Sequence, residues 1–599
     1  MLLLYAHIVF AYDPASMHPY KVKLKKDRTI LVQLIRDVIN IDNTNPKILE
    51  KVLRKYAEGA EVPSKGIVLR EYEKMKKDLN LNLEEEAKFY SLIKMKNVRT
   101  ASGVTPVTVL TKPFPCPGKC IFCPNDVRMP KSYLANEPAA QRAEANRFDP
   151  YLQTHNRLAA LRNIGHPIDK VELIILGGTW SSYPEPYQIW FVKRCFDAMN
   201  NFYITSPDLI EPNISQPYNE EKLEDIKGDE MHKSYNLIIS EALRRQNMLE
   251  EKASWGDLFL AHRKNETTKI RCVGLVIETR PDEINEKEVI RIRRLGATKV
   301  QIGIQSLNDT VLKKNKRRHD VRQTKKAFAL LRSAGFKIHV HWMPNLYGSN
   351  PEMDIRDYKK IFANKNFRPD EIKIYPCSLI ESAELMSYYK KGLWKPYTEV
   401  VLLEVLKESI KLTPEYCRIT RMIRDIPSTN IVVGNKKTNF RQLVEGELER
   451  AFIKIKEIRY REIRSEKVEA WELRAKKIEY STSVSTEVFI EYVNQENKIA
   501  GFLRLSLPTI CKPNHFVSEL QDSAIIREIH VYGQAVNIGE KKLGSAQHFG
   551  LGKKLIRKAI RIAKSEGFKK LSVISSIGTR EYYRKNGFKD GDFYQHMLM

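Results

Sequence analysis

Three cysteines on one short run are the residues of this chain best suited to chemistry. Cys116, Cys120 and Cys123 have the spacing C-x3-C-x2-C in the run CPGKCIFCP. Thiolates are soft ligands, so three of them on a tight loop can bind three irons of a 4Fe–4S cluster and leave the fourth iron open. An open iron can chelate S-adenosylmethionine (SAM) and pass it one electron, which releases a 5′-deoxyadenosyl radical. The spacing therefore predicts a cluster that cleaves SAM.

A zinc knuckle or three unrelated thiols are the alternatives for this run. Structural zinc usually takes four ligands, and no fourth Cys or His lies nearby in the sequence. The eight cysteines of the 599-residue chain are too scattered for a disulfide framework. We therefore expect a reduced, cytoplasmic setting, which an iron–sulfur cluster also needs.

A second candidate site lies near the end of the sequence, in the run QHFGLGKKL. Gln547, Gly550 and Gly552 follow an expected strand and open an amphipathic helix. Backbone N–H groups that are free of side chains at a helix N-terminus can hold a pyrophosphate. This run and the later GTREYYRKNGF are similar to the acetyl-CoA site of GNAT acetyltransferases, in which Tyr582 or Tyr583 would approach the thioester sulfur. The alternative for the two tyrosines is packing in the core.

The net charge of the chain is +28, from 101 Lys and Arg against 73 Asp and Glu. Such an excess favours a polyanionic partner, because phosphate groups attract Lys and Arg. The run 313–326 is the clearest basic stretch, and a solvated basic surface is its alternative interpretation. The apolar start MLLLYAHIVFAY is too short to cross a bilayer, and no later stretch reaches 18 apolar residues. We therefore expect no membrane span.

The elements that must position these residues change in type along the chain. Apolar residues three and four apart within 21–95 predict a small helical region with basic residues between them. From about residue 100, β-branched runs alternate with helical segments, which predicts an α/β sheet of parallel strands, open or closed into a barrel. The expected strands are 105–111, 171–178, 272–282, 299–306, 336–344 and 371–376.

Ligands of such sheets bind at the carboxyl ends of the strands. The residues that follow or end an expected strand are those of the cysteine loop, Gly177, Gly178, Thr179, Glu278 and Gln305. We therefore expect them on one rim, and this convergence is the main support for the cluster. Four regions result: 1–95 is helical, 96–395 holds the sheet, 396–470 is a helical, basic connector, and 471–599 is a second α/β domain.

The chain resembles the family of the Elongator catalytic subunit, in its single-chain archaeal and bacterial form. Over nearly the whole length it carries, in order, TKPFPCPGKCIFCP, MPKSYLANEPAAQRA, DKVELIILGGTW, ETRPD, VQIGIQS, AIIREIHVYG, QHFGLGKKL and GTREYYRKNGF. The resemblance implies a radical-SAM, partial TIM-like βα barrel fused to a C-terminal GNAT domain. It implies an acyltransferase that uses acetyl-CoA and SAM to form 5-carboxymethyluridine at the wobble uridine of tRNA. The tRNA would bind through its anticodon stem-loop, with the basic helices of 1–95 and the run 313–326 holding its phosphates. A reductant protein would supply the electron.

The resemblance also implies roles for individual residues. Cys116, Cys120 and Cys123 would hold the 4Fe–4S cluster, while Lys170 and Tyr583 would be catalytic. SAM would be contacted by Gly177, Gly178 and Thr179, with Glu278 and Gln305 as weaker candidates. Acetyl-CoA would be contacted by Glu528, Ile529, His530, Val531, Gln547, Gly550, Leu551, Gly552, Lys553 and Tyr583. Many relatives bind zinc through cysteines of the connector, but the matching stretch 453–464 has none, so no structural zinc is expected.

Three other functions fit part of the sequence. A protein lysine acetyltransferase with a structural cluster would need a general base, for which Glu528 is the candidate. A tRNA-binding scaffold with vestigial sites is the second, and a radical enzyme that methylthiolates a base is the third. The last usually needs a second cluster, and the sequence has no further cysteine triplet. In the favoured reaction acetyl-CoA must reach the rim of the barrel, so we expect the barrel and the GNAT domain to pack face to face.

Overall fold

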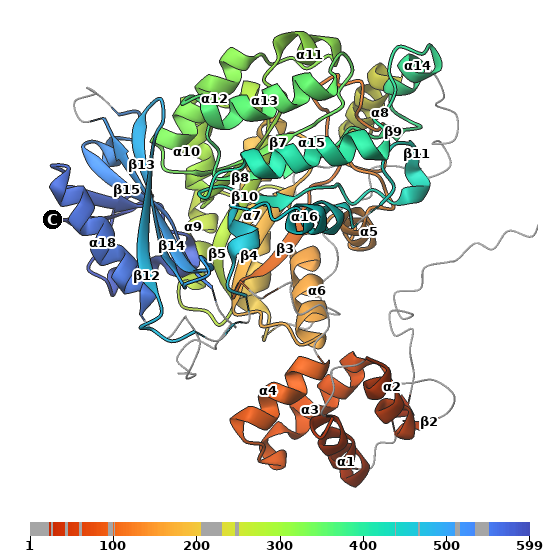
Figure 1. Ribbon diagram of the computed structural model, residues 1–599. Helices are drawn as coiled ribbons and strands as arrows, with labels where there is room; N and C mark the ends of the chain where they lie inside the picture. Colours follow the sequence, from red (N-terminus) through yellow and green to blue (C-terminus); the bar gives the residue numbers. More distant parts are fainter. Residues whose placement is uncertain are drawn as a thin grey trace, which may run out of the picture. The chain divides into compact units, whose positions relative to one another are not determined.

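The computed structural model divides into two compact units (Figure 1). It describes residues 23–24, 28–41, 46–58, 63–93, 100, 102–204, 231–245, 251–437, 439–464, 466, 468–509, 515–532 and 550–599. The smaller unit comprises Met1–Asn97 with Ala159–His166, and the larger comprises Val98–Leu158 with Pro167–Met599. None of the helices in the described ranges combines the length and the apolar character needed to cross a bilayer.

The smaller unit is helical, as the sequence predicts. Its longer described elements are α1 (Arg28–Ile39), α2 (Pro46–Lys55), α3 (Lys65–Leu79) and α4 (Leu83–Ile93). Apolar residues three and four apart give α1 one buried face, which includes Leu34, Ile35 and Val38. This face packs into one core with Tyr72 and Phe89, whose ring centroids lie 4.4 Å apart. Exposed positions of these helices carry basic residues, which include Arg28, Arg36, Lys51 and Lys74.

The larger unit begins with a parallel seven-stranded sheet that forms a half barrel. The strands are β3 (Thr105–Leu110), β4 (Lys170–Leu176), β5 (Arg271–Thr279), β6 (Lys299–Gln305), β7 (Lys337–Trp342), β8 (Glu371–Ile374) and β10 (Arg418–Arg421). Their order in the sheet is β10-β8-β7-β6-β5-β4-β3, and every neighbouring pair is parallel. The six strands expected from the sequence are therefore confirmed. The seventh, β10, comes from the segment 396–470, which the sequence presents as a connector.

Helices between the strands, and one after β10, cover the outer face of this sheet (Figure 1). They include α5 (Pro138–Ala145), α6 (Pro150–Asn163), α7 (Glu185–Asn201), α9 (Trp255–Asn265), α10 (Glu286–Arg294), α11 (Asp309–Lys314), α12 (Val321–Ser333), α13 (Pro351–Ala363), α15 (Glu399–Leu412) and α16 (Phe440–Arg450). One more helix, α8 (Met231–Arg245), lies in the long segment between β4 and β5. Since every neighbouring pair of strands is parallel, all strands run the same way and their carboxyl ends share one rim.

The end of the larger unit is a second sheet with the GNAT arrangement. Its strands are β12 (Arg474–Ser481), β13 (Ser485–Val493), β14 (Ile499–Pro508), β15 (Ser523–Val531), β16 (Lys570–Val573), β17 (Lys589–Asp590) and β18 (Gln595–Leu598). The order is β12-β13-β14-β15-β16-β18-β17. The amphipathic helix α18 (Leu551–Ser565) packs Leu555, Ala559 and Ala563 into its core. The predicted C-terminal α/β domain is thus confirmed.

The two sheets meet through buried charges at the amino ends of the barrel strands. Asp370 directly precedes β8 and pairs with Arg332 at 3.2 Å, with Arg504 of β14 at 3.4 Å and with Arg527 of β15 at 2.7 Å. The cysteine loop and the GNAT domain therefore lie at opposite ends of the barrel strands. The length of β4, roughly 20 Å, indicates how far apart these two ends are. The domains do pack together, but not against the rim that the sequence analysis expects.

Candidate active site

The cysteine loop follows directly from the carboxyl end of β3. Cys120 and Cys123 are buried and Cys116 is half-buried. Asn236 of α8 holds the loop by two hydrogen bonds: its amide oxygen accepts from the Cys116 N–H at 3.0 Å, and its amide nitrogen donates to the Cys116 carbonyl at 3.0 Å. The Cys116 sulfur lies 3.8 Å from the Thr179 hydroxyl, and the Cys123 sulfur lies 2.9 Å from the Ser132 hydroxyl.

Two arginines place positive charge beside the loop. The Arg317 Nη1 atom lies 3.2 Å from the Cys120 sulfur and the Arg280 Nη1 atom lies 4.0 Å from it. The hydrogen bond from Cys123, together with these two cations, holds the pKa of the Cys120 thiol well below its ordinary value. Asp282 fixes the Arg280 guanidinium through hydrogen bonds of 3.0 and 2.8 Å. The loop is thus arranged for a thiolate, which is the form that binds iron.

The donor set fits a 4Fe–4S cluster. Each iron of such a cluster takes its own thiolate, so the three sulfurs do not need to meet at one ion. In the described ranges no group of three His, Cys, Asp or Glu side chains could hold a single metal ion. Gly118 lies so close to the Arg280 guanidinium that a side chain at position 118 would displace the guanidinium. The residue type at Gly118 therefore matters for the charge beside the cysteines.

The turn that follows β4 lies beside the cysteine loop. Gly177 and Gly178 have φ values of 137° and 60°, a region that strains other residues. A Cβ atom at Gly177 would overlap the Thr111 hydroxyl, and one at Gly178 would lie 3.7 Å from the Lys131 backbone nitrogen. Thr179 is buried, with its hydroxyl toward Cys116. Two bare glycines therefore leave backbone amides next to the cysteines, as a bound SAM would require.

Glu278 and Gln305 end β5 and β6 on the same rim. The Glu278 carboxylate lies 3.4 Å from the Tyr133 hydroxyl and 3.7 Å from His341 Nδ1, and burial raises the pKa of this carboxyl. Gln305 has a φ of 62°, and within the described part of the chain its buried Oε1 atom has no hydrogen-bond partner. An orphaned buried acceptor costs free energy unless a ligand satisfies it. The shared rim is confirmed, whereas the ligand contacts of these residues stay predictions.

Lys170 lies at the other end of the barrel, because it begins β4. Burial and the neighbouring Arg271 lower its pKa, and Asp169 opposes them. Arg271 and Cys272 touch the GNAT domain: a Cβ at Gly578 would lie 2.6 Å from the Arg271 Cβ. The structure therefore places Lys170 near the GNAT domain and far from the cysteine loop, as a contact with acetyl-CoA would require.

The GNAT sheet is open where acetyl-CoA would bind. Strands β15 and β16 pair in parallel from Ser523 to Ile526 and then separate. After Ile526, β15 continues through Arg527 to Glu528, Ile529, His530 and Val531. The separation of the two strands gives an extended ligand a place to bind along this stretch.

The helix α18 and two tyrosines lie beside this opening. Gly550 caps α18 with a φ of 61°, Leu551, Gly552 and Lys553 begin the helix, and Gln547 lies outside the described residues. A side chain at Gly552 would collide with the hydroxyl of Tyr582. Tyr583 is 7% exposed and packs on Phe588 in the core of the domain. The structure thus places the Tyr582 hydroxyl at the helix N-terminus and Tyr583 in the core, and the catalytic role that the resemblance implies for Tyr583 stays a prediction.

The side chain of Glu528 is held in ion pairs where the GNAT sheet meets the barrel. It forms buried ion pairs with Lys337 of β7 and, at 2.8 Å, with Arg504. Burial alone would raise its pKa, but the two cations hold the pKa of this carboxyl below its ordinary value. A carboxylate held this way is a poor general base. The only base that the sequence offers for lysine acetylation is thus engaged elsewhere.

Sequence reasoning missed three contacts of the site. Asn236 gives no local signal, because a single asparagine in a helix is usually solvated. Arg317 belongs to the basic run 313–326, which the sequence presents as a surface, yet its side chain reaches Cys120 and the Gly303 carbonyl. Lys131 packs 4.5 Å from the centroid of the Tyr235 ring and lies near the cysteines.

The chain matches three family models. The Radical SAM superfamily matches residues 244–360, the Radical_SAM C-terminal domain matches 369–450, and the Acetyltransferase (GNAT) family matches 455–588. These models support a 4Fe–4S cluster and SAM in the first sheet and acetyl-CoA in the second. The segment 396–450 thus belongs to the barrel side of the chain, in line with β10.

Relatives match over almost the whole length. The chain is 39% identical over 572 residues to the tRNA uridine(34) acetyltransferase of Methanocaldococcus infernus, covering 90% of this chain and 97% of the relative. It is 36% identical to the protein of that name from Dehalococcoides mccartyi, over 82% of this chain and 96% of the relative. Elongator complex protein 3 of Homo sapiens is 31% identical over 84% of this chain and 86% of its own. A solved structure of the archaeal M. infernus Elp3 with an N-terminal deletion matches with a TM-score of 0.64 and 35% identity, over 83% of this chain and 99% of that one.

Proposed function

The chain belongs to the Elongator complex protein 3 family, and we propose that it is a tRNA wobble-uridine carboxymethyl synthase. In this proposal it uses SAM and acetyl-CoA to form 5-carboxymethyluridine. The observation that carries the proposal is that the residues of the two candidate cofactor sites lie at the two ends of one half barrel. Cysteine loop, glycine turn and Gln305 share the carboxyl rim, and the open GNAT strands with Lys170 lie at the amino end.

The chemistry of the two sites is complementary. When bound, the cluster and SAM supply a carbon radical that can activate the methyl group of acetyl-CoA for addition to carbon 5 of uridine. The chain's residues bind and orient the reactants: Gly177 and Gly178 offer backbone amides, and Glu278 and Gln305 offer oxygen atoms. Arg280 and Arg317 keep positive charge beside Cys120, which stabilises the thiolate that binds iron.

The inside of the half barrel links the two ends through polar side chains. Lys299 of β6 pairs with Glu172 of β4 at 2.6 Å and with Glu371 of β8 at 3.1 Å, so all three project from the concave face. Further along, Gln301 accepts from Lys373 at 2.6 Å. A polar interior of this kind suits the passage or anchoring of a polar acyl donor between the ends, whereas a stable barrel with no internal function is usually filled by apolar residues.

The substrate in this proposal is the anticodon stem-loop of tRNA. Exposed cations support it: α11, α12 and the loop between them present Lys313, Lys314, Arg318, Arg322, Lys325 and Lys326 at the surface. A wobble base is already single-stranded, which lowers the cost of moving it out of its stack. A reductant protein completes the proposal as the electron donor.

One reaction tests this function. Protein reconstituted anaerobically with iron and sulfide is incubated with SAM, acetyl-CoA, a reductant and tRNA, and the digested nucleosides are analysed by mass. We expect 5-carboxymethyluridine that depends on every component, with 5′-deoxyadenosine as co-product. Acetylation of lysine without any change in the tRNA would favour the acetyltransferase alternative and overturn the proposal.

A further inference from the structure

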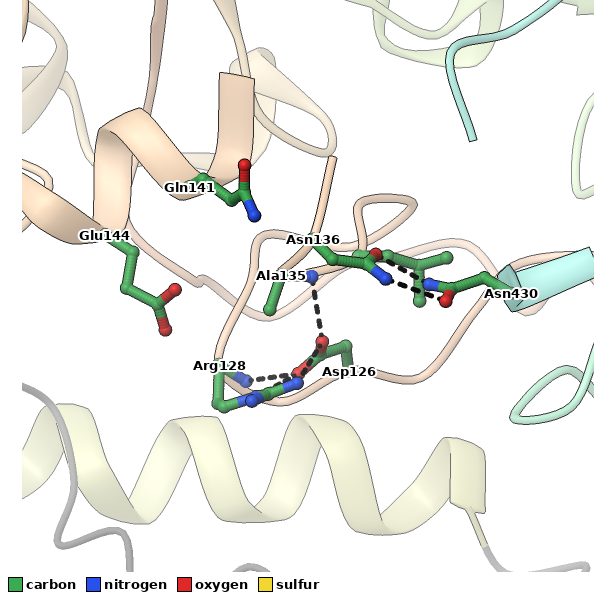
Figure 2. Close-up of a pocket in the computed structure, with 8 residues that line it drawn as sticks. Asp126, Arg128, Ala135, Asn136, Gln141, Glu144 and Asn430 are labelled. Atoms are coloured by element: carbon green, nitrogen blue, oxygen red, sulfur yellow. Dashed lines mark hydrogen bonds and ion pairs between the residues drawn. The ribbon is translucent and has the colours of Figure 1, made fainter. Parts of the chain in front are cut away.

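A polar cavity of about 440 Å³ lies beside the segment that follows the cysteine loop. Its volume is within the range of about 300–1,000 Å³ that is typical of small-ligand sites. The lining residues come from this segment, from α5 and from the stretch after β10; they are Asp126, Arg128, Leu134, Ala135, Asn136, Gln141, Glu144 and Asn430. Figure 2 shows Arg128 and Asp126 on one side of the space, Gln141 and Glu144 reaching toward it from α5, and the two asparagines at its end.

The segment 125–137 separates this cavity from the candidate SAM site. On one face, the Ser132 hydroxyl lies 2.9 Å from the Cys123 sulfur and the Tyr133 hydroxyl lies 3.4 Å from Glu278. The other face of the same segment lines the cavity. A ligand in the cavity would therefore be separated from the candidate SAM site by this one segment of the chain.

Arg128 forms a flat, fixed platform in the wall. Its Nε and Nη2 atoms each donate to one oxygen of Asp126 at 2.9 Å, a two-point pair that fixes the plane of the guanidinium. Asp126 is in turn held by the Ala135 N–H at 3.1 Å. The Arg128 side chain is still 50% exposed. Unpaired RNA bases commonly stack on such guanidinium planes.

Three amides could read the edge of a base. Asn136 and Asn430 exchange hydrogen bonds of 2.7 and 2.6 Å, which uses one N–H of each and leaves each a second N–H. Gln141 contributes a third amide from α5 (Figure 2). Amide side chains pair with the polar edges of bases through a donor and an acceptor together.

The charge of the wall excludes a phosphate as the occupant. Among the described residues of the lining, Arg128 is the single cation, against the carboxylates of Asp126 and Glu144. The charge of Arg128 is already neutralised by Asp126. We propose that the cavity binds an unpaired nucleobase that neighbours the target uridine in the RNA. This inference rests on the proposed function, because it takes the substrate to be an anticodon loop.

The test compares binding of a fluorescent anticodon stem-loop with versions in which one nucleotide beside the wobble uridine is abasic. The wild-type protein should lose about tenfold in affinity when the base is missing either just before or just after the uridine, the loss expected for one stacked base. The variant Arg128→Met should bind the intact RNA about tenfold more weakly than the wild type does. Its affinity should not fall further when the RNA is the abasic one that weakened binding to the wild type. Arg142→Met removes the same charge from α5 outside the lining, so it should keep the wild-type response to the abasic RNA.

Two results would overturn the inference. One is a wild-type protein that binds intact and abasic RNA equally well. The other is an abasic penalty that is the same in Arg128→Met as in the wild type. Asn430→Ala repeats the comparison without touching the Arg128–Asp126 pair, and it should also reduce the abasic penalty. Absence of any stem-loop binding by the wild-type protein would instead refute the proposed function, and the subsite with it.

Discussion

At the scale of single residues, Gln305 is the clearest mark of an absent ligand. Its side-chain oxygen is buried beside the rim and, among the described residues, accepts no hydrogen bond. Its left-handed backbone, with φ of 62°, turns the chain at the end of β6. A strained residue with an unsatisfied acceptor is more readily explained by ligand binding than by stability.

The variant Gln305→Met should therefore keep or slightly raise the melting temperature while weakening SAM binding by about tenfold. Removal of a buried, unsatisfied oxygen relieves the folded protein, and the same removal costs the ligand a hydrogen bond. Calorimetric titration of the reconstituted protein with SAM measures the effect, and Gln442→Met on the exposed face of α16 is the control. Unchanged SAM affinity in a folded Gln305→Met protein would exclude the contact.

At the scale of elements, α8 acts as a clamp on the cysteine loop. Asn236 satisfies both backbone groups of Cys116, and the Tyr235 hydroxyl donates to the Met129 carbonyl at 2.9 Å. The helix thus holds the loop on either side of the other two cysteines. A loop fixed in advance binds a cluster without a further cost of ordering.

Asn236→Ala should leave the barrel folded but reduce the iron content after reconstitution and broaden the EPR signal of the reduced cluster. The loss of two hydrogen bonds removes roughly 2 kcal/mol of support from the loop. Iron analysis and EPR measure the outcome, with Glu241→Ala on the same helix as the control. An iron content and EPR line shape equal to those of the wild type would show that the clamp is dispensable.

The N-terminus of α18 is the second element with a definite prediction. Gly552→Trp should abolish CoA binding, because an indole there would occupy the N-terminus of α18 and push the Tyr582 hydroxyl aside. Tyr582 is 38% exposed, so it can move without lowering the melting temperature. CoA affinity by calorimetry is the measurement. Gly446→Trp is the matched control, since Gly446 lies in a helix with open space around it. If Gly552→Trp keeps the wild-type affinity for CoA, the N-terminus of α18 is not the CoA site.

Most elements could be predicted from the sequence, for physical reasons that also explain the misses. The runs that became β4 to β7 are long, β-branched and buried, so their pattern is strong. By contrast β10 is the polar run RITR (418–421), which is a strand only because β8 lies beside it. The separation of β15 from β16 and the role of Arg317 depend on tertiary contacts, and local spacing carries no signal for these.

At the scale of the whole larger unit, buried ion pairs join the barrel to the GNAT domain. Burial alone would raise the pKa of Asp370, but Arg332, Arg527 and Arg504 hold the pKa of this carboxyl well below its ordinary value. The stability from this carboxylate is therefore present above the ordinary value of about 4 and is lost as the pH falls below it. The interface consequently orients two cofactor sites relative to each other through charges that must remain ionised.

Asp370→Asn should lower the free energy of unfolding at neutral pH by about 3 to 5 kcal/mol, because three buried arginines each lose one of their carboxylate partners. Its deficit relative to the wild type should shrink below about pH 4, where Asp370 of the unfolded wild-type chain takes up a proton that the folded protein does not, so the wild type loses stability that Asp370→Asn never had. Urea unfolding across this pH range is the measurement. Asp425→Asn, at an exposed pair with Arg421, should change stability by less than about 1 kcal/mol. A pH-independent deficit would contradict the assignment.

The central claim is that Cys116, Cys120 and Cys123 hold an iron–sulfur cluster with one iron open to SAM. EPR of the reduced, anaerobically reconstituted protein, recorded before and after addition of SAM, tests this most directly. We predict about four irons per chain, a cluster signal that shifts when SAM binds, and loss of both signal and shift in Cys120→Ser. A wild-type signal that SAM leaves unchanged, or a Cys120→Ser protein that still shows the shift, would contradict the claim.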